Sequence, residues 1–144
     1  MSDFDKQEKR IAEVFDEDEV PWVGDDTLTT YLDYLKKNVK LPCRITGIED
    51  MGYFGWEEYY CFGPGSKIEY ERLKKSRASF MDTFELLSFD NELYEEGILV
   101  NVRRVSDKKK FVIPLAELEA EDKKSKNYQL LDDYSVWFVN YGGG

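Results

Sequence analysis

Four acidic residues on both sides of a glycine-containing stretch are the strongest candidates for chemistry in this sequence. Glu49 and Asp50 precede two glycines, and Glu57 and Glu58 follow them. A hard divalent cation such as Ca²⁺ takes about six to eight oxygen ligands, and a loop bent at glycine can bring acids from its two ends together. The spacing predicts a Ca²⁺ site formed by these four residues. The alternative is that the acids only solvate a turn.

A second acidic pair, Asp132 and Asp133, lies in a segment with helical spacing near the C-terminus. Helical geometry turns Asp132 away from the apolar stripe of that segment and puts Asp133 at its edge, one turn from Trp137. One member of the pair is therefore expected to face a neighbouring loop and to add a metal ligand. A solvated helix face is the alternative.

Two further acidic groups are weaker candidates. Glu117, Glu119 and Glu121 alternate along an extended segment, which is typical of the solvent-exposed side of a strand. The acidic run from Asp16 to Glu19 contains no glycine, so it predicts no more than nonspecific attraction of cations.

Several classes of site are excluded by composition. The chain has no histidine, so it lacks an indispensable group for Ser-His-Asp or Cys-His catalysis, histidine zinc sites and non-haem iron triads. Cys43 and Cys61 are too few and too far apart for a zinc cluster and are expected to be reduced thiols. No EF-hand loop pattern occurs. No carboxylate pair can be placed on facing walls of a cleft, so we expect no enzyme.

Charge and length indicate one acidic domain. The chain has 144 residues and a net charge of −10, which disfavours nucleic acid as a partner. Residues 1–26 are expected to be an acidic tail or a short helix, and residues 27–144 a single globular domain. The sequence has no apolar run of about 18 residues and no leader peptide, so we expect a cytoplasmic protein without a membrane span.

The elements that must position these acids follow from hydrophobic periodicity. Residues 27–39 and 127–141 have apolar stripes with helical spacing, and Ser66 begins a capping box that predicts a short helix over residues 67–75. Four segments have strand-like composition: residues 43–48, 80–89, 97–105 and 109–114. The last two form a predicted hairpin. Together they predict an α+β fold, a small curved antiparallel sheet or SH3-like barrel covered by two main helices.

Several stretches also match a known family in their order. They are Tyr31-Leu-x-x-Leu35, Leu41-Pro42, Ile98-Leu-Val-x-Val-Arg-Arg104, Ile113-Pro-Leu-Ala-Glu-Leu-Glu119 and the segment from Asp122-Lys-Lys-Ser to Val136-Trp-Phe138. This pattern resembles the small bacterial calcium-binding proteins of the CcbP type. The resemblance implies a compact, non-EF-hand protein that buffers or senses cytosolic Ca²⁺ through Asp and Glu residues of its loops. It favours Glu49 and Asp50 as ligands, followed by Asp132 and Asp133.

A protein-interaction module is the alternative function. Aromatic side chains supply much of the binding energy at protein interfaces. Five of them lie between or beside the first group of acids and could form an exposed patch for an unidentified protein partner: Tyr53, Phe54, Trp56, Tyr59 and Tyr60.

Overall fold

The computed structural model describes residues 2–48, 54–61 and 63–142, which form one antiparallel sheet with helices around it. The strands are β1 (Cys43–Gly47), β2 (Thr83–Tyr94), β3 (Gly97–Arg104), β4 (Lys110–Pro114) and β5 (Leu118–Ala120). The α-helices are α1 (Asp3–Val14), α2 (Asp25–Asn38), α3 (Glu58–Cys61), α4 (Lys67–Leu73) and α5 (Lys126–Asn140), and the 3-10 turns are η1 (Gly55–Glu57) and η2 (Leu115–Glu117).

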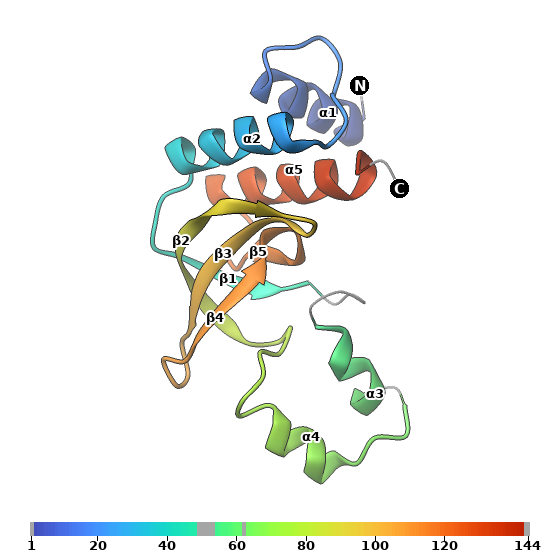
Figure 1. Ribbon diagram of the computed structural model, residues 1–144, viewed down its shortest axis with the longest axis vertical. Helices are drawn as coiled ribbons and strands as arrows, with labels where there is room; N and C mark the ends of the chain where they lie inside the picture. Colours follow the sequence, from blue (N-terminus) through green and yellow to red (C-terminus); the bar gives the residue numbers. More distant parts are fainter. Residues whose placement is uncertain (1, 49–53, 62, 143–144) are drawn as a thin grey trace.

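The sheet has the strand order β4-β3-β2-β1-β5, and each neighbouring pair is antiparallel. β2 is long and curved (Figure 1), and its register against β3 shifts between Leu86 and Ser88 and again between Phe89 and Leu93. Register shifts of this kind bend a strand and increase its twist. The predicted α+β fold with a curved antiparallel sheet is confirmed. The sheet is open, with β4 and β5 at its two ends, and is not the closed barrel that was the alternative.

The predicted hairpin is present as β3 and β4, and the alternation of β3 decides which side chains enter the core. Ile98, Val100 and Val102 are completely buried. β2 differs from its predicted range because it begins later and continues to Tyr94. The late start reflects a turn in which the Ser79 backbone N–H donates to the Asp82 carboxylate at 2.9 Å.

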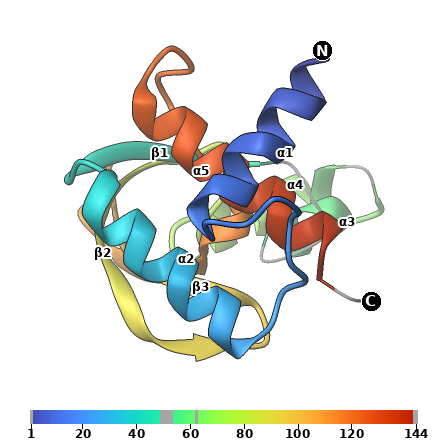
Figure 2. The same cartoon turned by 90° about the horizontal axis from the view of Figure 1, so that it is seen from above.

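α2 and α5 are the two main helices that the periodicity predicted, and they lie side by side over the sheet (Figures 1 and 2). The apolar stripe of α5 is buried, with Leu131, Tyr134 and Trp137 inaccessible to solvent. The Tyr134 hydroxyl accepts a hydrogen bond from the Ile98 backbone N–H at 3.0 Å. This bond fixes α5 to the first residues of β3.

The remaining helices lie at opposite ends of the molecule (Figure 1). α1 packs on α5 and α2, and its residues Ile11 and Ala12 are buried, so residues 3–14 are a packed helix. α3 and α4 lie at the end away from α1. The Ser66 hydroxyl accepts from the Glu69 backbone N–H at 3.0 Å and caps α4 as the sequence predicted.

Gly97, at the turn between β2 and β3, is expected to be intolerant of any side chain. Its φ angle is 81°, and a Cβ atom would lie 2.6 Å from the Tyr134 hydroxyl oxygen. Gly97→Ala should lower the free energy of unfolding by about 1–3 kcal/mol in urea denaturation. Gly55→Ala is the matched control, because a Cβ there meets no atom within 4 Å. Equal stability of the two variants would contradict this account.

Candidate metal centre

The predicted metal ligands that belong to the described residues fall into two separate parts of the molecule. Glu49 and Asp50 lie outside the described residues. Glu57 ends η1 and Glu58 begins α3, whereas Asp132 and Asp133 lie on α5, at the other end of the molecule (Figure 1). An ion bound near α3 is therefore not shared with the aspartates of α5.

Glu57 is buried and has a full set of hydrogen-bond donors. Its side chain is 2 % exposed, and Oε2 accepts from the Tyr70 hydroxyl at 2.7 Å and the Ser79 hydroxyl at 3.0 Å. Oε1 accepts from the Phe80 backbone N–H at 2.8 Å. Burial, followed by the hydrogen bond to Glu57, raises the pKa of Tyr70. Glu57 therefore joins η1 to α4 and to the turn before β2.

The aromatic residues beside Glu57 form an internal cluster more than an exposed patch. Phe54 is 2 % exposed and belongs to the core, so the expectation that it lies at the surface is corrected. The ring centroids of Trp56 and Tyr60 are 6.1 Å apart, and both rings are partly buried. Tyr59 is 55 % exposed, while Tyr53 lies outside the described residues. The rings of Trp56 and Tyr60 also pack against that of Tyr70, at centroid distances of 5.8 and 5.7 Å, so these rings shield one another.

Asp132 and Asp133 both contact helix α1, where a loop was expected. The Gln7 side-chain nitrogen donates to Asp132 Oδ2 at 3.0 Å and to Asp133 Oδ1 at 2.9 Å. Arg10 forms a two-pronged ion pair with Asp133, with Nε and Nη2 each 3.0 Å from a carboxylate oxygen. The bond to Asp133 is the main cause of the raised pKa of Arg10.

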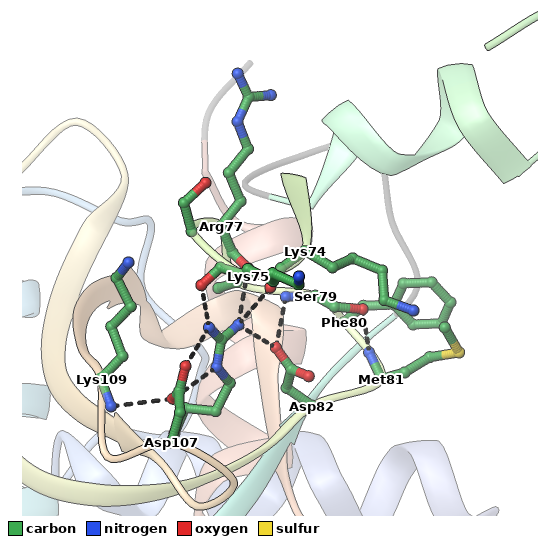
Figure 3. A network of polar contacts seen from close by, with 12 residues as sticks. Lys74, Lys75, Arg77, Ser79, Phe80, Met81, Asp82, Asp107 and Lys109 are labelled. Atoms are coloured by element: carbon green, nitrogen blue, oxygen red, sulfur yellow. Dashed lines mark hydrogen bonds and ion pairs between the residues drawn. The ribbon is translucent and has the colours of Figure 1, made fainter. Parts of the chain in front are cut away.

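Arg104 is 3 % exposed and has a large set of oxygen partners, whose residues are labelled in Figure 3. Its guanidinium donates to the carboxylates of Asp82, at 2.9 Å, and Asp107, at 2.8 and 3.0 Å. It also donates to three backbone carbonyls after α4, those of Lys74, Lys75 and Arg77. These bonds fix the end of α4 to the β3–β4 hairpin.

Carboxylates and backbone carbonyls are also the oxygen ligands that Ca²⁺ prefers, but here a protein cation occupies the position among them. The buried position of Arg104 was not predicted from the sequence, although a signal was present. Arg104 is in phase with Val100 and Val102, on the buried side of β3. An arginine at an inward position of a strand needs buried partners, which would have indicated this network.

The described carboxylates do not by themselves form a complete calcium site. Across residues 2–48, 54–61 and 63–142, no group of three or more Asp, Glu, Cys or His side chains could hold a metal ion. Glu57 and Asp133 already have protein donors, and both cysteines are free thiols. The carboxylates of the described residues therefore need further oxygen ligands to complete a Ca²⁺ coordination shell.

A comparison with known protein families shows the general function of this protein's family. A family model described as "Calcium binding", of the CcbP type, matches residues 65–138, just over half of the chain. The chain belongs to this family of calcium-binding proteins. The predicted resemblance is confirmed, Ca²⁺ is the ion that this family binds, and the family is not one of enzymes. No curated protein and no solved structure matches the chain significantly.

The matched region of the CcbP-type model contains Asp132, Asp133 and the whole Arg104 network, and it does not reach Glu49, Asp50, Glu57 or Glu58. Among the described helices, none combines the length and the apolar character that crossing a membrane requires.

Glu57→Gln should destabilise the protein. In this variant an amide nitrogen replaces one carboxylate oxygen and faces a hydroxyl or N–H donor. That buried donor then has no acceptor. We expect a loss of about 1–3 kcal/mol in the free energy of unfolding, measured in urea. Glu95→Gln, the same change on an exposed turn, should leave stability unchanged. If both variants are as stable as the parent, Glu57 does not hold this segment together.

Asp107 should contribute to acid sensitivity. Hydrogen bonding from Arg104 is the main cause that lowers the pKa of Asp107 from 3.8 to about 2. Because the folded-state pKa is the lower one, its stabilising effect is full above pH 3.8 and is lost as the pH falls towards 2. Asp107→Asn should therefore flatten the fall of Tm with pH in this window. Asp18→Asn, at an exposed position, is the control, and an identical slope in both would refute the assignment.

Proposed function

We propose that this protein binds Ca²⁺ reversibly in the cytosol, as a buffer or a sensor, with loop carboxylates in place of an EF-hand. The observation that carries this proposal is the match of residues 65–138 to a calcium-binding family. The net charge of −10 supports it, because a negative protein attracts divalent cations.

Glu49 and Asp50 are the proposed central ligands. They follow β1 in the sequence, and the pairing of β1 with β5 supports their assignment. The Ile48 backbone N–H donates to the Glu117 carbonyl at 2.9 Å, and Thr46 is paired with Glu119. Two acids from the family-matched region therefore lie beside the strand that leads to Glu49 and Asp50. We propose that Glu119 adds an oxygen ligand from β5.

The other predicted ligands have different roles in this proposal. Glu58, the next acid along the chain, is a better candidate than Glu57 to complete the set. Glu57 would have to give up three hydrogen bonds in a buried position, which is costly. Asp132 and Asp133 are proposed as a second, separate pair, and both already accept hydrogen bonds from helix α1.

The physical basis of binding would be the repulsion among neighbouring carboxylates. Close negative charges raise the free energy of the ion-free protein, and a divalent cation relieves that repulsion. A ligand that binds only the folded state also stabilises it, by about 2.7 kcal/mol at 100 times Kd. Ca²⁺ should therefore raise Tm.

Calorimetric titration with Ca²⁺ tests this proposal. The parent protein should bind with saturation, and Asp50→Asn should weaken binding at least about tenfold, which corresponds to about 1.4 kcal/mol. Mg²⁺ should bind more weakly, because it prefers a smaller octahedral shell and retains its waters. Asp18→Asn removes the same charge from the exposed segment before α2 and should bind like the parent. If calorimetry detects no heat of binding and Tm does not rise at up to millimolar Ca²⁺, the proposal is wrong.

A second candidate function is a protein-interaction module at the end of the molecule formed by α3 and α4. The observation that favours it is the exposure of two apolar side chains there, Tyr59 at 55 % and Ile68 at 86 %. The same titration separates the two functions, because this one requires no response to Ca²⁺.

A further inference from the structure

Within the described residues, the side-chain hydrogen bonds to Asp132 and Asp133 on α5 come from helix α1. One nitrogen atom, Nε2 of Gln7, lies within hydrogen-bond distance of an oxygen of each aspartate, at 3.0 and 2.9 Å. The two carboxylates, which consecutive helical positions would otherwise direct apart, therefore converge on one point. That point is filled by an amide of α1.

Arg10 supplies the charge that this pair requires. Its two bonds to Asp133 are both 3.0 Å long, and Asp133 is 6 % exposed. A carboxylate so far removed from water needs a counter-ion, and a two-pronged arginine is the strongest that a protein side chain provides. Gln7 and Arg10 thus occupy three of the four carboxylate oxygens in the pair.

A cavity adjoins this contact and is lined by further polar groups. It has a volume of about 270 Å³ and lies between α1, α2 and α5, with Asp133, Arg10, Glu13 and Tyr31 in its wall. Tyr31 is 1 % exposed as a residue and lines this cavity. A hydroxyl in the wall of a cavity can form a hydrogen bond with a water or a ligand inside it. The space beside the aspartates is therefore suited to a polar occupant.

Helix α1 lies outside the family-matched region, whereas both aspartates lie inside it. α1 is also held by a hydrogen bond that the Tyr141 hydroxyl donates to Glu8, by the buried residues Ile11 and Ala12, and by the packing of Phe15 against Tyr31 and Trp137. A short segment with a positive φ at Asp16 follows it. The helix is thus an attached element that covers an acidic pair of the family's own segment.

We propose that α1 is an intramolecular lid on Asp132 and Asp133. Gln7 and Arg10 take up carboxylate oxygens that would otherwise be available to a divalent cation, so the pair is closed while α1 is docked. This inference rests on the proposed function, because it concerns the regulation of cation binding by the same protein. It predicts that weakening the α1 contact exposes a cation site that the parent keeps closed.

Calorimetry and amide hydrogen exchange test the lid. Arg10→Gln removes the counter-ion, and Gln7→Ala removes the bridging amide while it leaves the Arg10–Asp133 ion pair intact. Lys9→Gln makes the same charge change as Arg10→Gln at an exposed position of the same helix and is the control. Relative to Lys9→Gln, we expect about fivefold or tighter Ca²⁺ binding, or an additional site, in both test variants. Adding Asp133→Asn should abolish this gain.

Hydrogen exchange provides a readout that needs no bound ion. Without Ca²⁺, amides of residues 3–14 should exchange faster in Arg10→Gln than in Lys9→Gln. If Arg10→Gln does not fold, Gln7→Ala decides the question. Ca²⁺ binding in Gln7→Ala and Arg10→Gln equal to that of Lys9→Gln would overturn the lid, even where the parent binds Ca²⁺ through Asp50. Absence of any binding that Asp50→Asn weakens would instead refute the proposed function.

Discussion

A charged group that leaves water needs a partner of opposite charge or a full set of hydrogen bonds, and this requirement shapes the interior of the protein. Arg104 is surrounded by two carboxylates and three carbonyls, Glu57 by two hydroxyls and an N–H group, and Asp133 by Arg10 and Gln7. Each network joins an outlying segment to the main body. Arg104 and Glu57 fix α4 and η1, and Asp133 fixes α1. The positions of the outlying helices therefore depend on internal charge compensation as well as on apolar burial.

The same compensation limits where a cation can bind. Calcium and arginine compete for the same oxygen atoms, since both are satisfied by carboxylates and carbonyls. The network around Arg104 has the ligand types of a calcium site, yet its centre is filled by a guanidinium that is almost fully buried. In a protein of this family, an acid whose oxygens already accept hydrogen bonds from buried protein groups serves the fold, as Glu57 does. We propose Glu49 and Asp50 as acids that bind the ion instead.

Much of the fold was predictable, and the reason is periodicity. The hairpin of β3 and β4 and the stripe of α5 each have a clear repeat, and the structure has both elements close to their predicted ranges. The late start of β2 was not predictable, because it depends on a turn closed by Asp82. For the candidate ligands, composition and family pattern pointed to acids of the right type. They did not show that Glu57 is buried among donors or that Asp133 faces an arginine more than one hundred positions earlier.

By itself, the sequence determined the α+β class, the pairing of a curved antiparallel sheet with two main helices, and membership of a calcium-binding family. These features follow from local patterns, in which neighbouring residues carry the signal. Only the tertiary structure decided that the sheet stays open, that α1 covers the aspartates of α5, and that Arg104 fills a shell of oxygens. Such outcomes depend on contacts between residues far apart in the chain. Charge pairing at that range is set by how the packed elements meet, and no local pattern encodes it.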